Sequence, residues 1–235
     1  MKHLLTLLCC NFLVLGMQAQ SLFGAWEHTS TADNGQHTRQ VLIFTDGYFS
    51  ATTFMKTSGA FVKSHGGSWH LQDGVLTQQL EFDTEIPERV GTDIHLKFRG
   101  DNHSITINEN LIYNRIDDGT PGALQGAWLM SGRVVEGKNQ IRDTSGPRKT
   151  MKILSGTRFQ WIAYHTDTKE FMGTGGGTYT TAAGVYTETI EFFSRDASRV
   201  GNSLQFDYEL VDGHWHHSGL SSKSDPIHEI WSLRK

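Results

Sequence analysis

Hydrophobic and polar residues alternate along much of the chain, which is typical of β-strands with one buried face. The alternation is clearest over 203–211, where Leu204, Phe206, Tyr208 and Leu210 are separated by polar residues. Other stretches rich in β-branched and aromatic residues, bounded by turn residues, lie at 151–154, 158–164, 177–181 and 185–193. Since no segment carries a convincing helical pattern, we predict an all-β protein.

The sequence also contains an internal repeat. The motif at 22–26 recurs at 124–128, and after a longer loop in the second copy the offset becomes 110 and stays constant for about sixty residues. At this offset Glu81-Phe82 matches Glu191-Phe192, and glycine pairs also coincide. We therefore predict two related domains, 20–118 and 119–235.

Antiparallel strands joined in chain order by short turns close most simply into an up-and-down barrel, which leaves no exposed sheet edge. The predicted fold class is therefore two tandem up-and-down antiparallel β-barrels of about eight strands each.

Each half begins with Gly-x-Trp, at Trp26 and Trp128, and ends on a strand that carries an arginine, at Arg115 and Arg234. This pairing resembles the lipocalin-like, or calycin, superfamily. The second half also resembles secreted bacterial lipocalin-like domains through the segments 175–179 and 186–191. The resemblance implies that each Trp packs across the closed end of its barrel with the late Arg over it. It implies no general activity, only a bias toward ligand binding.

The first 19 residues have the pattern of a secretory signal peptide, with a short polar start, an apolar run of about a dozen residues and a polar exit. We expect cleavage after Ala19 and export to the periplasm or the exterior. Cys9 and Cys10 both lie in this segment, whose apolar stretch is short for lipoprotein anchoring, so the mature chain is expected to lack cysteine. No other segment approaches the roughly 20 apolar residues that a membrane-spanning helix needs.

The charge balance gives no support for nucleic-acid binding. The chain has 21 basic and 25 acidic residues, with a formal net charge of -4, and no basic cluster stands out. The glycine-rich stretch at 173–177 lacks the following helix of a phosphate-binding loop.

The internal repeat separates scaffold from candidate site, because positions alike in both copies are expected to be structural. The second copy instead gains polar and aromatic groups where the first has Tyr48, Ala51, Phe54 and Gln78. The candidate ligand-binding residues are Arg158, Trp161, Tyr164, Tyr179, Tyr186, Glu188, Tyr208, Trp215 and His217. A buried Glu188 would need either a neutralising partner or a ligand.

No cofactor is predicted. His214 and His216 share a strand face and are weak candidates for metal ligands, but the acidic residue that would complete such a site is missing nearby.

Three functions remain open. The first is an exported protein that binds a small, partly apolar or aromatic ligand or a sugar in the C-terminal barrel. The second is an isomerase, lyase or hydrolase that uses Glu188 and His217 as an acid–base pair in the same cavity. The third is a structural or interaction module whose barrels are filled with side chains. The partner of the first two is a small molecule.

Overall fold

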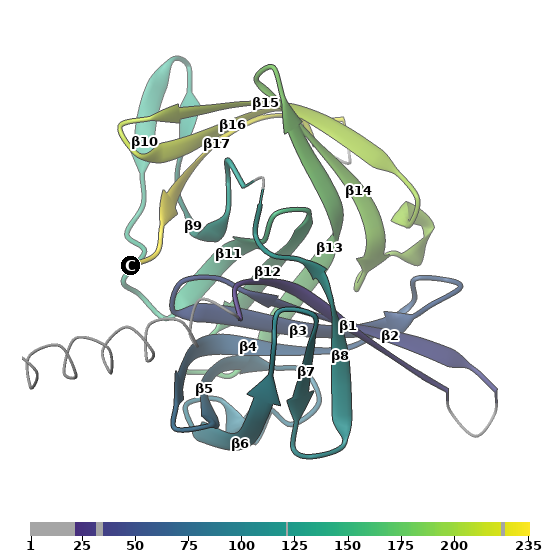
Figure 1. The fold of residues 1–235 in the computed structure, drawn as a ribbon. Coiled ribbons are helices and arrows are strands. Elements are labelled where there is room, and N and C mark those ends of the chain that lie inside the picture. The colour runs from purple at the N-terminus through teal and green to yellow at the C-terminus, as the bar shows by residue number, and fades with distance from the viewer. Residues whose placement is uncertain (1–21, 32–34, 121, 222–223) are drawn as a thin grey trace, which may run out of the picture.

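The computed structural model describes residues 22–31, 35–120, 122–221 and 224–235 and consists almost entirely of β-strands (Figure 1). The first eight strands form a closed antiparallel barrel, here the N-terminal barrel, in which β8 pairs with β1. Its strands are β1 (Gly24–Thr31), β2 (His37–Phe44), β3 (Tyr48–Met55), β4 (Phe61–Gln72), β5 (Val75–Asp83), β6 (Asp93–Gly100), β7 (Ser104–Ile107) and β8 (Leu111–Asp117).

The remaining strands form the C-terminal barrel, which is closed by pairing of β17 with β9. Its strands are β9 (Gly126–Val135), β11 (Arg148–Leu154), β12 (Arg158–His165), β13 (Phe171–Ala182), β14 (Val185–Phe193), β15 (Ser203–Val211), β16 (His214–Leu220) and β17 (Pro226–Leu233). A short extra strand, β10 (Lys138–Ile141), forms a hairpin with β9. The predicted all-β fold with two eight-stranded barrels and an internal repeat is therefore confirmed.

The repeated glycine pairs lie at equivalent β-bulges. The register shifts between Gly66 and Gly67 in β4 and between Gly176 and Gly177 in β13. A side chain at Gly177 would overlap the carbonyl oxygen of Thr189 on the neighbouring strand, and Gly67 meets the same obstacle. Glycine is required here because two strand backbones approach closely.

The N-terminal barrel is filled with apolar side chains. Trp26, Leu42, Phe44 and Ile105 are among the buried residues of one continuous cluster in its interior. In the C-terminal barrel the corresponding cluster includes Trp215, and further along the barrel the interior opens into a cavity.

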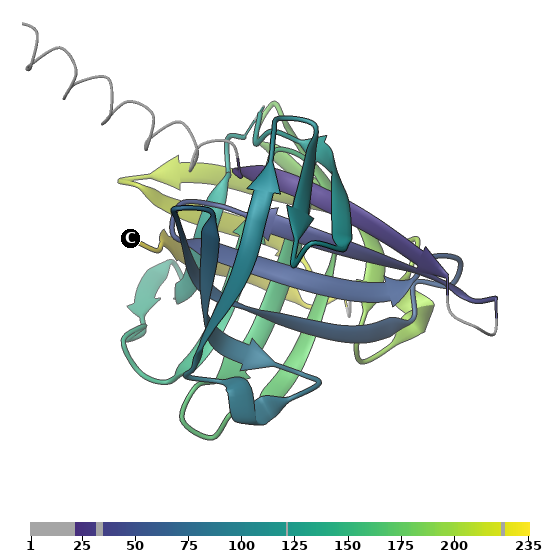
Figure 2. The same ribbon diagram turned by 60° about the horizontal axis from the view of Figure 1, so that its bottom comes forward.

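The two barrels pack against each other through the outer faces of their strands (Figures 1 and 2). Aromatic rings meet there in matched pairs, with Phe54 against Phe192 and Phe82 against Tyr164, both at a centroid distance of 5.1 Å. At the repeat offset of 110, Phe54 is equivalent to Tyr164 and Phe82 is equivalent to Phe192, so each pair is the counterpart of the other. An approximate twofold axis therefore relates the two barrels. Phe61 and Phe171, which are equivalent to each other, stack at 5.9 Å.

The arginine near the end of each half, Arg115 or Arg234, has different contacts in the two barrels. Trp26 and Trp128 each donate an indole hydrogen bond to a leucine carbonyl four residues earlier, at 2.9 Å. Arg115 lies 4.0 Å from the Trp26 ring, as the resemblance implies. In the second half Leu233 is the cross-strand neighbour of Trp128, and Arg234 extends to the other barrel instead. The expectation that an arginine lies over Trp128 is thus wrong, because Arg234 comes one residue after the position that faces Trp128.

The helices of the described residues are two single turns, η1 (Pro87–Arg89) and η2 (Ala197–Arg199), and neither could cross a membrane. The predicted signal peptide, including Cys9, Cys10 and Ala19, lies outside the described residues.

Candidate functional site

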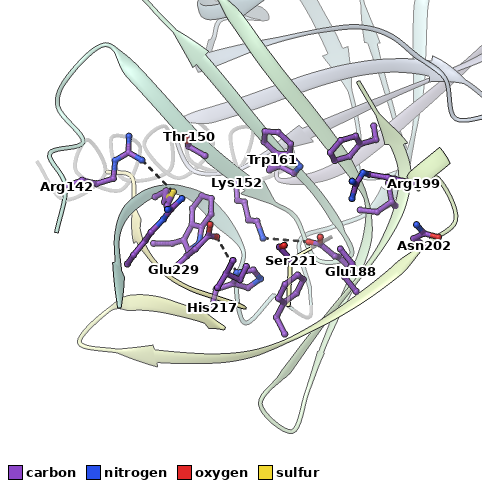
Figure 3. A pocket seen from close by; sticks show the side chains of 18 of the residues that line it. Arg142, Thr150, Lys152, Trp161, Glu188, Arg199, Asn202, His217, Ser221 and Glu229 are labelled. Atoms are coloured by element: carbon purple, nitrogen blue, oxygen red, sulfur yellow. Dashed lines mark hydrogen bonds and ion pairs between the residues drawn. The ribbon is translucent and has the colours of Figure 1, made fainter. Parts of the chain in front are cut away.

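A cavity of about 400 Å³ opens into the C-terminal barrel (Figure 3). Its wall combines apolar and aromatic side chains with a group of charged ones. The apolar lining comprises Met130, Trp161, Ile190, Phe193, Leu204, Phe206, Ile227 and Trp231. The charged and imidazole lining comprises Arg133, Arg142, Arg148, Lys152, Glu188, Arg199, His217 and Glu229. The volume is within the usual range for small-molecule sites.

Lys152, on β11, supplies a buried ammonium group at the inner end of the cavity. Its side chain is only 7 % exposed, and Nζ lies 5.0 Å from the Trp215 ring and 5.1 Å from the Tyr186 ring. The rings of Phe206 and Trp231 lie at 5.8 and 5.4 Å. These rings stabilise a cation electrostatically through their π faces.

Glu188, on β14, provides the nearest carboxylate to Lys152, with 3.7 Å between Oε2 and Nζ. It also accepts a hydrogen bond of 3.1 Å from the hydroxyl of Tyr186. Burial and the negative charge of Glu188 together hold the pKa of Tyr186 well above its usual range, so this tyrosine remains a hydrogen-bond donor. Glu188 therefore has the internal partners that its burial requires.

His217 and Glu229 form a second buried pair. His217 Nδ1 lies 3.5 Å from Glu229 Oε2, and the ring is 2 % exposed. Burial and the positive charge of Lys152 lower the pKa of His217 to about 4, so the imidazole is neutral at pH 7. Burial opposes ionisation of Glu229, but His217, Lys152 and Arg133 outweigh it and lower the pKa of the carboxyl. In Figure 3 Lys152 lies between this pair and Glu188.

Several buried donors around the cavity have no hydrogen-bond partner in the described part of the chain. They are the indole nitrogens of Trp215 and Trp231, and His217 Nε2 likewise has no partner there. Unpaired buried polar groups are costly, so such groups at a cavity indicate where a ligand could accept or donate hydrogen bonds.

Arg133, Arg142 and Arg148 are exposed and lie on the β9–β11 side of the cavity, and we call these three residues the mouth arginines. Arg142 directs one guanidinium nitrogen toward Met130 Sδ at 3.7 Å. Across the cavity, Arg199 lies close to Asn202 (Figure 3).

The N-terminal barrel lacks this polar interior. The repeat offset places Leu42 at the position of Lys152 and Gln78 at that of Glu188. Phe98 is equivalent to Tyr208 at the repeat offset, and each pairs with a residue on the next strand. The partner of Phe98 is Ile107 and the partner of Tyr208 is His217, so Ile107 occupies the position of His217. The charged interior is thus a feature of the C-terminal barrel.

The structure brings three of the nine predicted ligand-binding residues to the cavity wall, namely Trp161, Glu188 and His217. Tyr186 and Trp215 are fully buried directly behind the wall. Tyr179, whose hydroxyl bonds the carbonyl of Ser155, and the half-buried Tyr208 belong to the apolar cluster.

Arg158 and Tyr164 lie elsewhere, in the interface between the barrels. Arg158 pairs with Glu191 at 2.6 Å, and Tyr164 donates a hydrogen bond to Glu81. The expectation that these two residues face a cavity with Trp161 is a mistake of strand parity. Positions 158 and 164 share one face of β12, whereas 161 lies on the other.

Lys152, Glu229, Trp231 and the mouth arginines were missed by the sequence reasoning. Lys152 could have been found, because the same comparison of copies shows a lysine in place of Leu42. Arg148 likewise replaces Thr38 at the constant offset, whereas Glu229, Arg133 and Arg142 come from segments outside it, so only the structure reveals those three.

His214 and His216 do not form a metal site with each other. His214 bonds Ser232 at 2.9 Å, and His216 lies 3.2 Å from His228 on the neighbouring strand. Among the described residues, no three His, Cys, Asp or Glu side chains are placed to hold a metal ion.

Comparison with protein families gives a match over the C-terminal barrel. Residues 123–233, which contain all of its strands, match the model described as a domain of unknown function, DUF4488. A comparison with curated proteins finds no match to the chain. The C-terminal barrel is therefore similar to a family without an assigned activity, and the function must be argued from the cavity itself.

Proposed function

We propose that this chain is an exported binding protein built from two lipocalin-like barrels, and that its C-terminal barrel holds a small, partly aromatic ligand. The observation that carries the proposal is the cavity of about 400 Å³ with an aromatic wall and a few oriented polar groups. This combination is characteristic of small-molecule sites. The packing of Arg115 on Trp26 supports the lipocalin-like assignment of the first barrel.

The contrast between the barrels strengthens the proposal. The same scaffold is filled by Leu42 and Ile107 in the N-terminal barrel but carries Lys152 and His217 in the C-terminal one. A buried lysine and a buried histidine destabilise a fold relative to apolar residues of similar size. Their presence in one barrel is explained if they contribute to ligand binding.

The second candidate function is an enzyme, and one observation favours it. A neutral imidazole beside an ionised carboxylate, as in His217 and Glu229, is an arrangement suited to a general base. The acid–base pair expected between Glu188 and His217 is replaced by this pair, because Glu188 is engaged with Lys152 and Tyr186. An enzyme would lose turnover in His217→Gln while retaining ligand binding.

A thermal-shift screen of the exported chain against sugars, fatty acids and aromatic acids tests the proposal. A ligand present at about 100 times its dissociation constant stabilises the folded state by roughly 2.7 kcal/mol. We expect the shift to disappear in Trp161→Ala and to persist in Lys138→Ala, which removes an exposed side chain on β10 outside the cavity. A shift that survives in Trp161→Ala would place the ligand outside this cavity. Absence of any shift would favour the filled-barrel alternative.

A further inference from the structure

The cavity concentrates positive charge in an acidic protein. The chain has a formal net charge of -4, yet five cationic side chains line the cavity against two carboxylates. Glu188 pairs with Lys152, Glu229 is stabilised by the positive charges of Lys152 and Arg133, and Arg199 pairs with Asp196 outside the cavity lining. Even with Lys152 and Arg199 paired, the formal charges of the lining leave an excess of positive charge on the side of the mouth arginines.

The mouth arginines carry most of this excess. In the described part of the chain none of the three forms an ion pair with a carboxylate. The interface between the barrels uses its arginines differently, because Arg39, Arg158 and Arg234 all bind a glutamate there. Guanidinium groups recognise oxyanions with paired hydrogen bonds, so three unpaired ones on one side of a cavity are suited to an anion.

The inner end of the cavity is less suitable for an anion. The ammonium of Lys152 is surrounded by aromatic rings and lies 3.7 Å from Glu188, so an anion bound there would be repelled by that carboxylate. The cavity wall also includes the aromatic side chains of Trp161, Phe193 and Trp231. The cavity therefore combines an aromatic interior, in which the buried charges are internally paired, with a cationic opening.

From this arrangement we propose that the ligand is an amphipathic anion, with an aromatic or apolar body inside the barrel and one oxyanionic group held by the mouth arginines. At the packing density of protein interiors, 400 Å³ accommodates a body of about 15–20 non-hydrogen atoms. This inference rests on the proposed binding function and names the class of ligand.

Two fluorescent probes of nearly the same shape test the charge requirement. 1-Anilinonaphthalene-8-sulfonate carries a sulfonate, whereas N-phenyl-1-naphthylamine has the same ring system without it. The dissociation constants of both are measured for the wild type, for the triple variant Arg133→Ala/Arg142→Ala/Arg148→Ala, and for Lys138→Ala. All three arginines are exposed, so the triple variant is expected to fold, which circular dichroism checks.

We expect the triple variant to bind the sulfonate about tenfold more weakly and the neutral probe within twofold of the wild type, with Lys138→Ala unchanged. Raising the salt concentration should weaken the binding of the sulfonate probe but not that of the neutral probe, and only in proteins that retain the arginines. If the ratio of the two affinities changes less than threefold in the triple variant, the inference is overturned.

Trp161→Ala separates failure of this inference from failure of the proposed function. If both probes lose affinity in Trp161→Ala while the triple variant leaves their ratio unchanged, the cavity binds ligands but does not select anions. If neither probe binds, or both bind Trp161→Ala as well as the wild type, the proposed function itself is wrong.

Discussion

His217 makes the stability of this protein depend on pH in the mildly acidic range. Its pKa is lowered to about 4 by burial and by the positive charge of Lys152, so the folded state holds a neutral ring at pH 5. In the unfolded chain the ring titrates near its usual pKa of about 6.5. Between these values the unfolded chain binds a proton that the folded chain does not, so stability falls as the pH falls from about 6.5 toward 4.

The size of the effect follows from the two pKa values. The full difference corresponds to about 3 kcal/mol, and about 2 kcal/mol of it is lost between pH 7 and pH 5. The buried carboxylates Glu81 and Glu229 have pKa values below their ordinary range in the folded state, so they titrate mainly below this window. Burial lowers the pKa of His65 to about 4 as well, so His65 titrates in the same window, and His217 is assessed from the difference between the wild type and a His217 variant.

The assay is urea unfolding at pH 7, 6 and 5 of the wild type, His217→Gln and His70→Gln. His70 is an exposed residue of β4 and serves as the matched control. We expect the wild type and His70→Gln to lose about 2 kcal/mol more than His217→Gln between pH 7 and pH 5. The same pH dependence in all three proteins would refute the assignment of His217 as a buried neutral ring.

Further substitutions test the interface, the cavity and the bulge by urea unfolding at pH 7. Glu81→Gln leaves a largely buried guanidinium without its carboxylate and should cost about 2–3 kcal/mol, whereas Glu85→Gln, in an exposed ion pair, should cost less than about 0.5 kcal/mol. Lys152→Leu should destabilise by about 2–3 kcal/mol because the Glu188 carboxylate loses its cation, and the double variant Lys152→Leu/Glu188→Gln should recover to within about 1 kcal/mol of the wild type. A double variant no more stable than the single one would contradict the pairing. Gly177→Ala should cost about 1–3 kcal/mol, because the methyl group overlaps a backbone carbonyl, and an unchanged midpoint would show that the bulge can relax.

The fold could be predicted because two independent patterns agree. Alternation over 203–211 predicts strands, and the constant offset that relates Phe82 to Phe192 predicts two copies of one domain. Strand order and closure follow from these, since consecutive antiparallel strands have one simple way to eliminate their edges. These features depend on local sequence and need no knowledge of distant contacts.

The site was only partly predictable, because it depends on which strand face points inward. Comparison of the copies found Trp161, Glu188 and His217, but it also selected Arg158 and Tyr164, which differ from the first copy because they serve the interface. Lys152 lies in β11, where two other basic residues precede it, so the sequence alone does not mark it as the buried one. A sequence shows that a position has changed between copies, but not whether the change serves a ligand or a neighbouring barrel.

The filled N-terminal barrel has a structural role, because strand β11, which carries Lys152, packs against it. The outer faces of β11 and β12, with Met151, Ile153 and Ile162, are buried against the N-terminal barrel, while their inner faces carry Lys152 and Trp161 into the cavity. The outer face of this part of the cavity wall is therefore covered by the N-terminal barrel. Packing against a solid barrel fixes the strands that hold the ammonium and the indole, so the wall of the cavity can lack a filled core on its inner side and still keep its shape. One copy of the repeat thus supports the fold, and this leaves the other free to carry the buried charges of the proposed binding site.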